Sequence, residues 1–503
     1  MRRHIGLLAL VIAAAGLVLH TWYLHPWLLD DAFICFRYAQ HLVQGQGLVF
    51  NPGERVEGYT CFLWVLLLAG PRALGADLVL TSRALGLACS LGTLVLLAGS
   101  GRLLRPLPSQ APALAVVLLG TCGAFTAWAA SGMEVALFSF LLLLAVLLYG
   151  WAQQAGGGRR LALPGLALAL LAMTRPEGLL VAAVLCADQV ATRRRGDSLY
   201  LLLTFLGLFG AYYAWRFAYY GYPWPNTYYA KVGYTLDQVA RGLRYGGDFA
   251  AASAGLLLPL AAGVLSPGWW RRDHPLHLVP PIVLLYSGYV VVVGGDCMPA
   301  FRFFAPLLPL VCLGAAYQVL SLGVRPPVLA GAITIMLAFN LCQYQASPEL
   351  RRAKNDQVAY WGKEVGLWLR QHARPGALLA ANTAGSVPYY SRLRTIDMLG
   401  INDAHIAHRP LPSLGQGASG HEKGDGAYVL SRRPDYIQFA SSLGSIWPVF
   451  PGDRELDASP EFRRCYLLRA YRLPSGRVLY LYQRRPAAPG WPPGRGETHP
   501  RQP

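Results

Sequence analysis

Two adjacent carboxylates, Asp30 and Asp31, follow the first apolar segment of the chain, in the stretch LHPWLLDDAFICFRYAQ. Carboxylates beside hydrocarbon are costly and usually mark a functional site. A carboxylate within hydrogen-bond reach of a hydroxyl can remove its proton as a new bond forms, so both residues are candidate general bases. Helix capping is the competing interpretation, because an Asp before a helix satisfies free N–H groups. The sequence does not separate Asp30 from Asp31.

Other polar side chains lie where apolar segments end, in NPGERVEGYT, SGMEVAL, TRPEG, PWPNTYYAK and GGDCMPAFRFF. Cations at this depth suit a phosphate at the level of the lipid headgroups. Taken singly, each is explained as well by a structural ion pair or by a side chain that snorkels to the interface. Their convergence on one side of a membrane favours a binding site. The predicted donor-phosphate and substrate-binding residues are Lys231, Arg302, Arg175, Glu57, Tyr59, Glu134, Asn226 and Asp296.

Neither a metal nor a cofactor is required by these residues. A divalent cation that bridges a carboxylate and a phosphate is compatible with them, but no ligand spacing indicates one, so metal ligands stay unassigned. The nine cysteines include no C-x-x-C pair, which gives no support to a zinc ribbon or a thioredoxin motif. Cys35 and Cys61 could pair outside the membrane, and their separation in the sequence does not decide it.

The composition indicates an integral membrane protein. Only 14% of the 503 residues are charged and 54% are hydrophobic, which leaves too little polar surface for a soluble chain of this length. The formal charge of +18 comes mainly from Arg residues in short blocks between apolar segments. Such blocks orient membrane helices, whereas a nucleic-acid-binding protein gathers them on one face, so nucleic acid is not an expected partner.

Eleven segments have the length and hydropathy of membrane spans. The loops between them alternate, and the short basic loops all fall on one side, which predicts a cytoplasmic N-terminus and a C-terminal part outside the membrane. The first outer loop, 21–83, contains the apolar stretch 61–70, which is too short to cross and is predicted to lie on the membrane surface. The predicted spans are 5–20, 84–101, 112–128, 136–151, 161–175, 177–191, 198–218, 253–266, 279–294, 303–320 and 327–344.

The chain changes character after residue 345. Residues 355–373 have the spacing of an amphipathic helix, and short strands are predicted at 377–381, 435–439 and 476–483. The expected organisation is therefore a transmembrane domain over 1–345, a small extracytoplasmic α/β domain over 346–484 and a tail over 485–503. The tail is rich in Pro and Gly and is predicted to be disordered.

The stretch DDAFICFRYAQHLVQGQGLVFNPGERVEGYT resembles the first outer loop of the family of the mycobacterial terminal β-(1→2)-arabinofuranosyltransferase. The motifs WAASGMEVALF, TRPEG, PWPNTYYAK, GGDCMPAFRFFAPLLP and GHEKGDGAYVLSRRPDYI follow in the order found in that family, so the resemblance covers roughly 20–485. Single motifs such as TRPEG are weak signals, whereas the ordered set is specific.

The resemblance implies a GT-C glycosyltransferase, a multi-span enzyme of the bacterial inner membrane. Such an enzyme takes a sugar, here arabinofuranose, from a polyprenyl phosphate and places it on a glycan, lipid or protein outside the membrane. It also implies that the acidic pair Asp30 and Asp31 lies at the reaction centre. A multi-span transporter or lipid-sugar flippase is the alternative. A flippase is expected to carry polar residues through the midplane and to show repeat symmetry, and the sequence shows neither feature.

Overall fold

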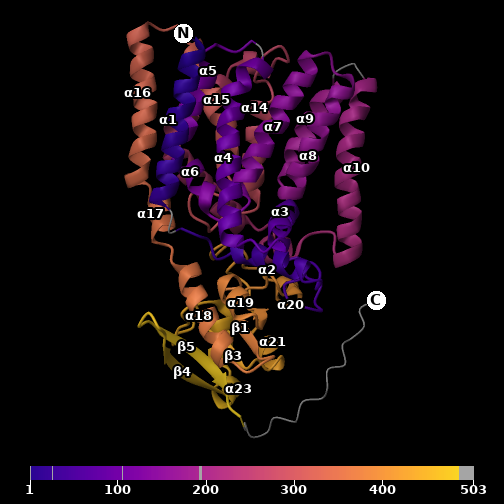
Figure 1. The fold of residues 1–503 in the computed structure, drawn as a ribbon, viewed down its shortest axis with the longest axis vertical. Coiled ribbons are helices and arrows are strands. Elements are labelled where there is room, and N and C mark those ends of the chain that lie inside the picture. The colour runs from indigo at the N-terminus through magenta and orange to yellow at the C-terminus, as the bar shows by residue number, and fades with distance from the viewer. Residues whose placement is uncertain (1, 25–26, 105, 192–194, 487–503) are drawn as a thin grey trace.

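The computed structural model describes residues 2–24, 27–104, 106–191 and 195–486. A bundle of helices occupies one end of the molecule and a sheet-containing region the other, with the first outer loop between them (Figure 1). The bundle helices are α1 (Arg2–Tyr23), α4 (Leu78–Leu103), α5 (Ala111–Gly120), α6 (Gly123–Thr126), α7 (Val135–Gln154), α8 (Ala162–Thr174), α9 (Gly178–Ala191), α10 (Arg195–Tyr220), α12 (Leu236–Ala252), α13 (Ala254–Val264), α14 (Val279–Val292), α15 (Leu308–Ser321) and α16 (Pro326–Ala346).

Each of the predicted spans coincides with a helix of this bundle. Within the described ranges, five helices are long and apolar enough to cross a membrane, or up to seven if each of two bent helix pairs is one span. The remaining apolar helices are shorter, so the chain is a multi-pass membrane protein and the number eleven stays a prediction. The two bent pairs are Ala111–Gly120 with Gly123–Ala130, at 64°, and Leu236–Ala252 with Ala254–Val264, at 102°.

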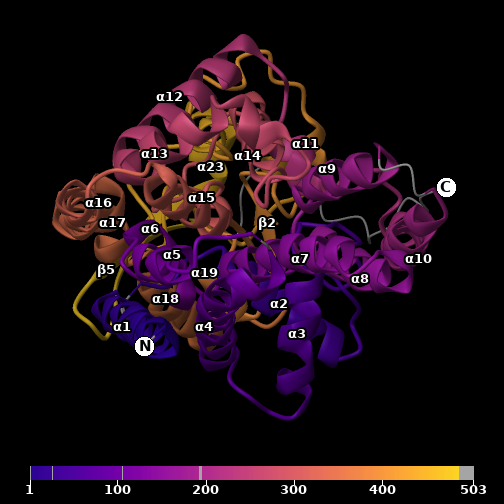
Figure 2. The same cartoon turned by 90° about the horizontal axis from the view of Figure 1, so that it is seen from above.

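The burial of the helices follows their position in the bundle. Helix α7 has apolar side chains on all sides, most of them buried, as expected of a helix surrounded by other helices. Helices α10 and α16 lie at opposite edges, and both expose large apolar side chains such as Leu203 and Ile335 (Figures 1 and 2). Apolar surface of this kind is stable where it contacts lipid.

The first outer loop forms two helices at the end of the bundle, α2 (Ala32–Val43) and α3 (Phe62–Ala73). Helix α3 covers the stretch that was predicted to lie on the membrane surface, and it contacts α2, α4 and α8. Figure 1 shows it beside α2, at the end of the bundle that faces the sheet-containing region. Its position on the membrane surface stays a prediction.

The C-terminal region contains one five-stranded sheet of order β2-β1-β3-β5-β4. Strands β2, β1 and β3 are parallel, while β5 pairs antiparallel with β3 and β4. Helix α18 (Val358–His372) packs on one face through Val365 and Leu369, and α21 (Gly426–Ser431), α22 (Pro451–Ala458) and α23 (Pro460–Cys465) pack on the other. The strands are β1 (Leu378–Ala381), β2 (Arg394–Asp397), β3 (Tyr436–Gln438), β4 (Tyr466–Arg472) and β5 (Val478–Arg484).

The predicted helix and the three predicted strands of this region correspond to α18, β1, β3 and β5, whereas β2 and β4 were missed. Strand β4 is an edge strand whose middle residues are exposed on both faces, so it lacks the alternation that identifies a strand. The domain boundaries stay a prediction. The predicted disorder of the tail concerns residues of which all but 485 and 486 lie outside the described ranges.

Buried hydrogen bonds join the first outer loop to the C-terminal region. The guanidinium of Arg37, on α2, donates to the carbonyl oxygens of Phe50 (2.6 Å), Pro388 (2.5 Å) and Leu393 (2.8 Å). The side chain of Asn51 exchanges two hydrogen bonds with the backbone of Thr395, at 2.9 and 3.0 Å. Because a buried Arg that loses its acceptors is strongly destabilising, these contacts fix the C-terminal region against α2.

Candidate active site

A cavity of about 330 Å³ lies where the ends of α2, α7, α9, α11 (Asn226–Lys231) and α14 meet. Its wall is mostly apolar, with charged side chains set into it. Most of the segments singled out in the sequence contribute to this wall, so the predicted convergence of the outer loops is observed. The predicted residues that line it are Asp31, Tyr59, Glu134, Arg175, Lys231, Asp296 and Arg302.

The break between α8 and α9 places Arg175 in the cavity. Pro176 cannot continue the helix, and Arg175 takes an extended conformation after Thr174 ends α8. Gly178 then starts α9 so close to α8 that a Cβ atom would lie 2.7 Å from backbone atoms of Leu171 and Ala172, which explains the glycine in TRPEG.

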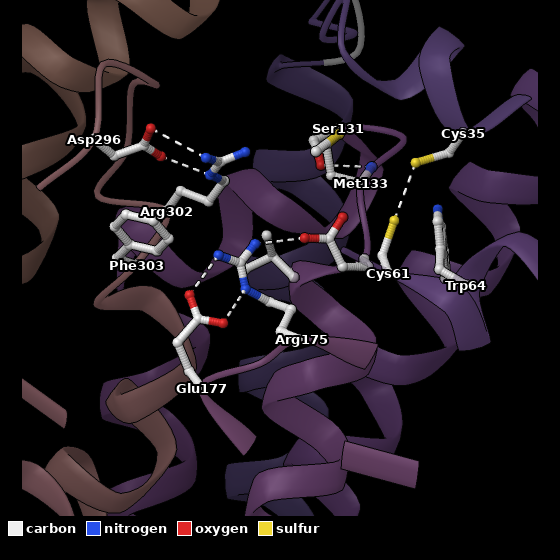
Figure 3. A network of polar contacts seen from close by, with 12 residues as sticks. Cys35, Cys61, Trp64, Ser131, Met133, Arg175, Glu177, Asp296, Arg302 and Phe303 are labelled. Carbon is white, nitrogen blue, oxygen red and sulfur yellow. Dashed lines mark hydrogen bonds and ion pairs between the residues drawn. The ribbon is translucent and has the colours of Figure 1, made fainter. Parts of the chain in front are cut away.

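Two clusters of buried ion pairs line the cavity (Figure 3). Arg175 pairs with Glu134 (Nη1–Oε1, 2.5 Å) and with Glu177 (Nη2–Oε1, 2.8 Å), while Arg302 makes a bidentate pair with Asp296 (2.6 and 3.1 Å). The Phe303 ring lies near both guanidinium groups, 5.1 Å from Cζ of Arg175 and 5.3 Å from that of Arg302. Both arginines are therefore neutralised by carboxylates, which is the structural alternative considered for Arg175.

Asp31 and Lys231 also line the cavity but are not part of these ion pairs. Within the described ranges, the Asp31 carboxylate and the Lys231 ammonium make no hydrogen bond and no ion pair with another side chain or with the backbone. Asp31 precedes α2 without accepting a capping hydrogen bond, so the capping hypothesis does not account for it. A carboxylate and an ammonium that are not neutralised by the protein are the groups available to a ligand.

A second cavity, of about 770 Å³, lies between the bundle and the C-terminal region. Its polar lining includes Asn382, Thr383, Asp397 and His421 from the C-terminal region and Arg352 from α17 (Pro348–Asn355). Five residues line both cavities, so the two spaces adjoin. The shared residues are Asp31, Ile34, Lys231, Ile401 and Ser419.

The carboxylate of Asp30 points to the C-terminal region. It accepts hydrogen bonds from the backbone N–H groups of Gly385 (3.0 Å) and Ser386 (2.9 Å) and from the Ser386 hydroxyl. Burial raises the pKa of Asp30 to about 6, against the hydrogen bonds from Ser386, which favour the charged form. The structure thus separates the acidic pair: Asp30 holds the α19 turn (Ser386–Ser391) and lines the second cavity alone, whereas Asp31 lines both cavities.

Three predicted residues have structural partners. Glu57 forms a buried ion pair with Arg216 of α10 (2.5 Å), and the Asn226 amide donates to the carbonyl oxygens of Gly400 and Ile401, so neither side chain lines a cavity. Tyr59 lines the first cavity while its hydroxyl lies 3.0 Å from that of Tyr220. These contacts shape the wall of the cavity.

The sequence analysis missed Ile401 and Ser419, which the C-terminal region contributes to both cavities. Nothing in their local sequence marks them, because they reach the site through the docking of a separate region. Arg216 was also missed, although a single Arg inside the apolar segment 198–218 is a signal that could have found it.

In the described part of the chain, no group of three or more His, Cys, Asp or Glu side chains could hold a metal ion. Among the described residues, Asp31 is the one carboxylate of the first cavity that forms no ion pair.

Comparisons with known proteins agree with this arrangement. The structure is similar to that of ArnT from Cupriavidus metallidurans bound to undecaprenyl phosphate, with a TM-score of 0.55 over 77% of this chain and 85% of that one, at 11% identity. The chain has a GT-C glycosyltransferase fold. The apo oligosaccharyltransferase of Archaeoglobus fulgidus is also similar, with a TM-score of 0.50 over 98% of this chain and 75% of that one, at 11% identity.

Two curated relatives confirm the resemblance to the arabinofuranosyltransferases. The chain is 31% identical over 326 residues to the terminal β-(1→2)-arabinofuranosyltransferase of Mycobacterium tuberculosis, a match over 57% of this chain and 51% of that protein. It is 30% identical to the enzyme of the same name from Corynebacterium glutamicum, over 57% of this chain and 47% of that one. The chain thus spans about half the length of these relatives. Residues 348–483 match a domain of unknown function, DUF8728.

Proposed function

We propose that this protein is a membrane glycosyltransferase that moves a sugar from a polyprenyl phosphate to an acceptor hydroxyl. The observation that carries the proposal is the junction of two cavities at Asp31 and Lys231, the carboxylate and the ammonium that other residues leave unpaired in the described site. The first cavity lies at the ends of the bundle helices, where a lipid-linked donor would enter from the membrane, and the second lies between the bundle and the C-terminal region, where a hydrophilic acceptor would enter. The two substrates would meet at the shared residues.

Asp31 is the general base of this scheme. It takes the proton of the acceptor hydroxyl while the oxygen attacks the anomeric carbon, the bond from that carbon to the phosphate oxygen breaks, and charge grows on the departing phosphate. Lys231 stabilises this charge and acts more strongly in the transition state than in the ground state. Arg175 and Arg302 line the same cavity, where their N–H groups could donate to the phosphate, but carboxylates already balance the charge of both.

The names of the curated relatives favour arabinofuranose as the sugar, and a glycan, lipid or protein outside the membrane as the acceptor. The proposed location is the bacterial inner membrane, with eleven spans, the N-terminus inside and the C-terminal region outside. Labelling of single introduced cysteines with an impermeant reagent tests this topology. Residue 400 is expected to react from the outer face, and reaction from the cytoplasmic face would contradict it.

The proposed activity is tested with purified protein in liposomes that contain one polyprenyl-phosphate sugar at a time, including the arabinofuranose form. We expect acceptor-dependent release of the carrier lipid with one donor, and loss of this release in the Asp31→Asn variant. A folded protein that releases no carrier from any donor, with several classes of acceptor supplied, would contradict the proposal. Transport of the intact lipid-linked sugar across the bilayer would favour a flippase instead.

A further inference from the structure

A pair of cysteines lies in the wall of the first cavity. Cys35 is on α2, one turn after Asp31, and Cys61 immediately precedes α3. Their sulfur atoms are 3.1 Å apart and both side chains are buried, at 4% and 3% exposure. Figure 3 shows the two sulfur atoms pointing toward each other beside Trp64. No other pair of cysteines in the described ranges has sulfur atoms in hydrogen-bond contact.

We propose that Cys35 and Cys61 form a disulfide in the mature protein. Their separation is about 1 Å longer than an S–S bond of ~2.05 Å, so a small movement of the side chains closes it. The proposal rests on the topology proposed above, which places residues 21–83 outside the membrane, in a compartment where disulfides persist. Buried cysteines that pack as small apolar side chains are the alternative, and the experiment below separates the two.

The reaction is a dithiol–disulfide exchange. The two thiols lose two protons and two electrons as the S–S bond forms, and a disulfide of an extracytoplasmic thiol oxidoreductase accepts them and becomes a dithiol. Oxidised glutathione is the corresponding oxidant in vitro. Because both sulfur atoms are buried in the folded protein, we expect the bond to form while the outer loop folds.

The position of the pair gives the bond a role at the site. Asp31, Ile34 and Cys35 line the first cavity from one face of α2, and Cys61 lines it from the start of α3. The loop between the two cysteines carries Asn51, which binds the C-terminal region. A covalent link across this loop therefore fixes the face of α2 that presents Asp31 to both substrates.

Mass spectrometry of differentially labelled thiols tests the proposal on the whole protein. Membranes are dissolved in denaturant with N-ethylmaleimide, which labels every free thiol. The protein is then reduced, and the thiols released by reduction are labelled with iodoacetamide. We expect Cys35 and Cys61 to carry the second label and Cys465, which is buried in the C-terminal region, to carry the first. Finding the first label on both Cys35 and Cys61 would overturn the proposal.

A stability measurement gives a second readout. A reductant present throughout the thermal scan reaches the buried bond once the outer loop opens, and it should lower the apparent melting temperature of the wild-type protein by on the order of 5 °C, because the reduced loop has more conformational freedom when unfolded. The Cys35→Ala/Cys61→Ala variant should already melt at the lower temperature and should not respond, and an equal response in both proteins would refute the link. Neither assay needs transferase activity, so failure of the proposed function and failure of this inference are distinguishable.

Discussion

The sharpest prediction follows from the different roles of the two carboxylates: Asp31 is the proposed general base, and Asp30 binds the backbone of the C-terminal region. Replacing Asp31 by Asn removes the base but leaves a side chain of the same shape, in a position where the carboxylate has no bonded partner among the described residues. The fold should therefore be unaffected. Loss of a general base costs about 10²- to 10⁴-fold in rate, roughly 3–5 kcal/mol of transition-state stabilisation. We expect turnover to fall by this factor while donor binding is retained.

The same change at Asp30 should have a different effect. In Asp30→Asn the amide oxygen can still accept from Ser386, but the amide nitrogen then faces the Gly385 N–H, so one hydrogen bond is lost, at about 1–3 kcal/mol. Burial of a charge is relieved at the same time, because the pKa of Asp30 is raised to about 6 and its ionisation above that pH costs the folded state roughly 3 kcal/mol. The two effects nearly cancel, so the variant should fold and keep at least about a tenth of its activity.

The assay measures carrier release at saturating donor, together with donor affinity and melting temperature, for both variants. A pH series adds an independent check. Because the folded pKa of Asp30 lies above the unfolded value, its contribution makes the wild-type protein more stable as the pH falls from 7 to 5, and Asp30→Asn should lack this component. Equal losses of turnover in the two variants, with folding intact, would refute the assignment, as would a fully active Asp31→Asn protein.

Three further predictions concern the rest of the site. Lys231→Met should lower kcat/KM for the donor at least about tenfold, roughly 1.4 kcal/mol or more, mainly through kcat and without changing the melting temperature, and normal donor use would place the phosphate elsewhere. Arg302→Met should instead destabilise the protein by about 3–5 kcal/mol, because it leaves Asp296 charged and buried, and Asp296→Asn in the same chain should recover much of the loss in thermal unfolding. Gly385→Ala places a Cβ atom 1.9 Å from the Asp30 carbonyl oxygen, so it should weaken the packing of the C-terminal region against the bundle by about 1–3 kcal/mol. Faster proteolysis after residue 346 is the expected readout.

The sequence predicted the convergence of the outer segments because the positions of the Arg-rich loops determine which loops share a side of the membrane. It could not separate Asp30 from Asp31. The residues that donate hydrogen bonds to the Asp30 carboxylate are 355 and 356 positions away in the chain, so the sequence around Asp30 does not indicate this contact. Local pairs were easier: Arg175 and Glu177 lie two residues apart, and their ion pair was among the stated alternatives. Glu134 joins that pair from a different helix, which spacing along the chain does not reveal.

The charges of the first cavity explain how an apolar wall can hold so many ionisable side chains. Ions are costly in an apolar environment unless they are paired, and five of the seven that line this cavity are joined in ion pairs. The remaining two, Asp31 and Lys231, stand where the first cavity opens into the wider second one, which offers them solvent or substrate. In the proposed reaction, a lipid phosphate in the first cavity would meet one cation without an ion-pair partner, and an acceptor in the second would meet one carboxylate without an ion-pair partner. Both side chains line the two cavities where they adjoin, which is where the proposed reaction would need them.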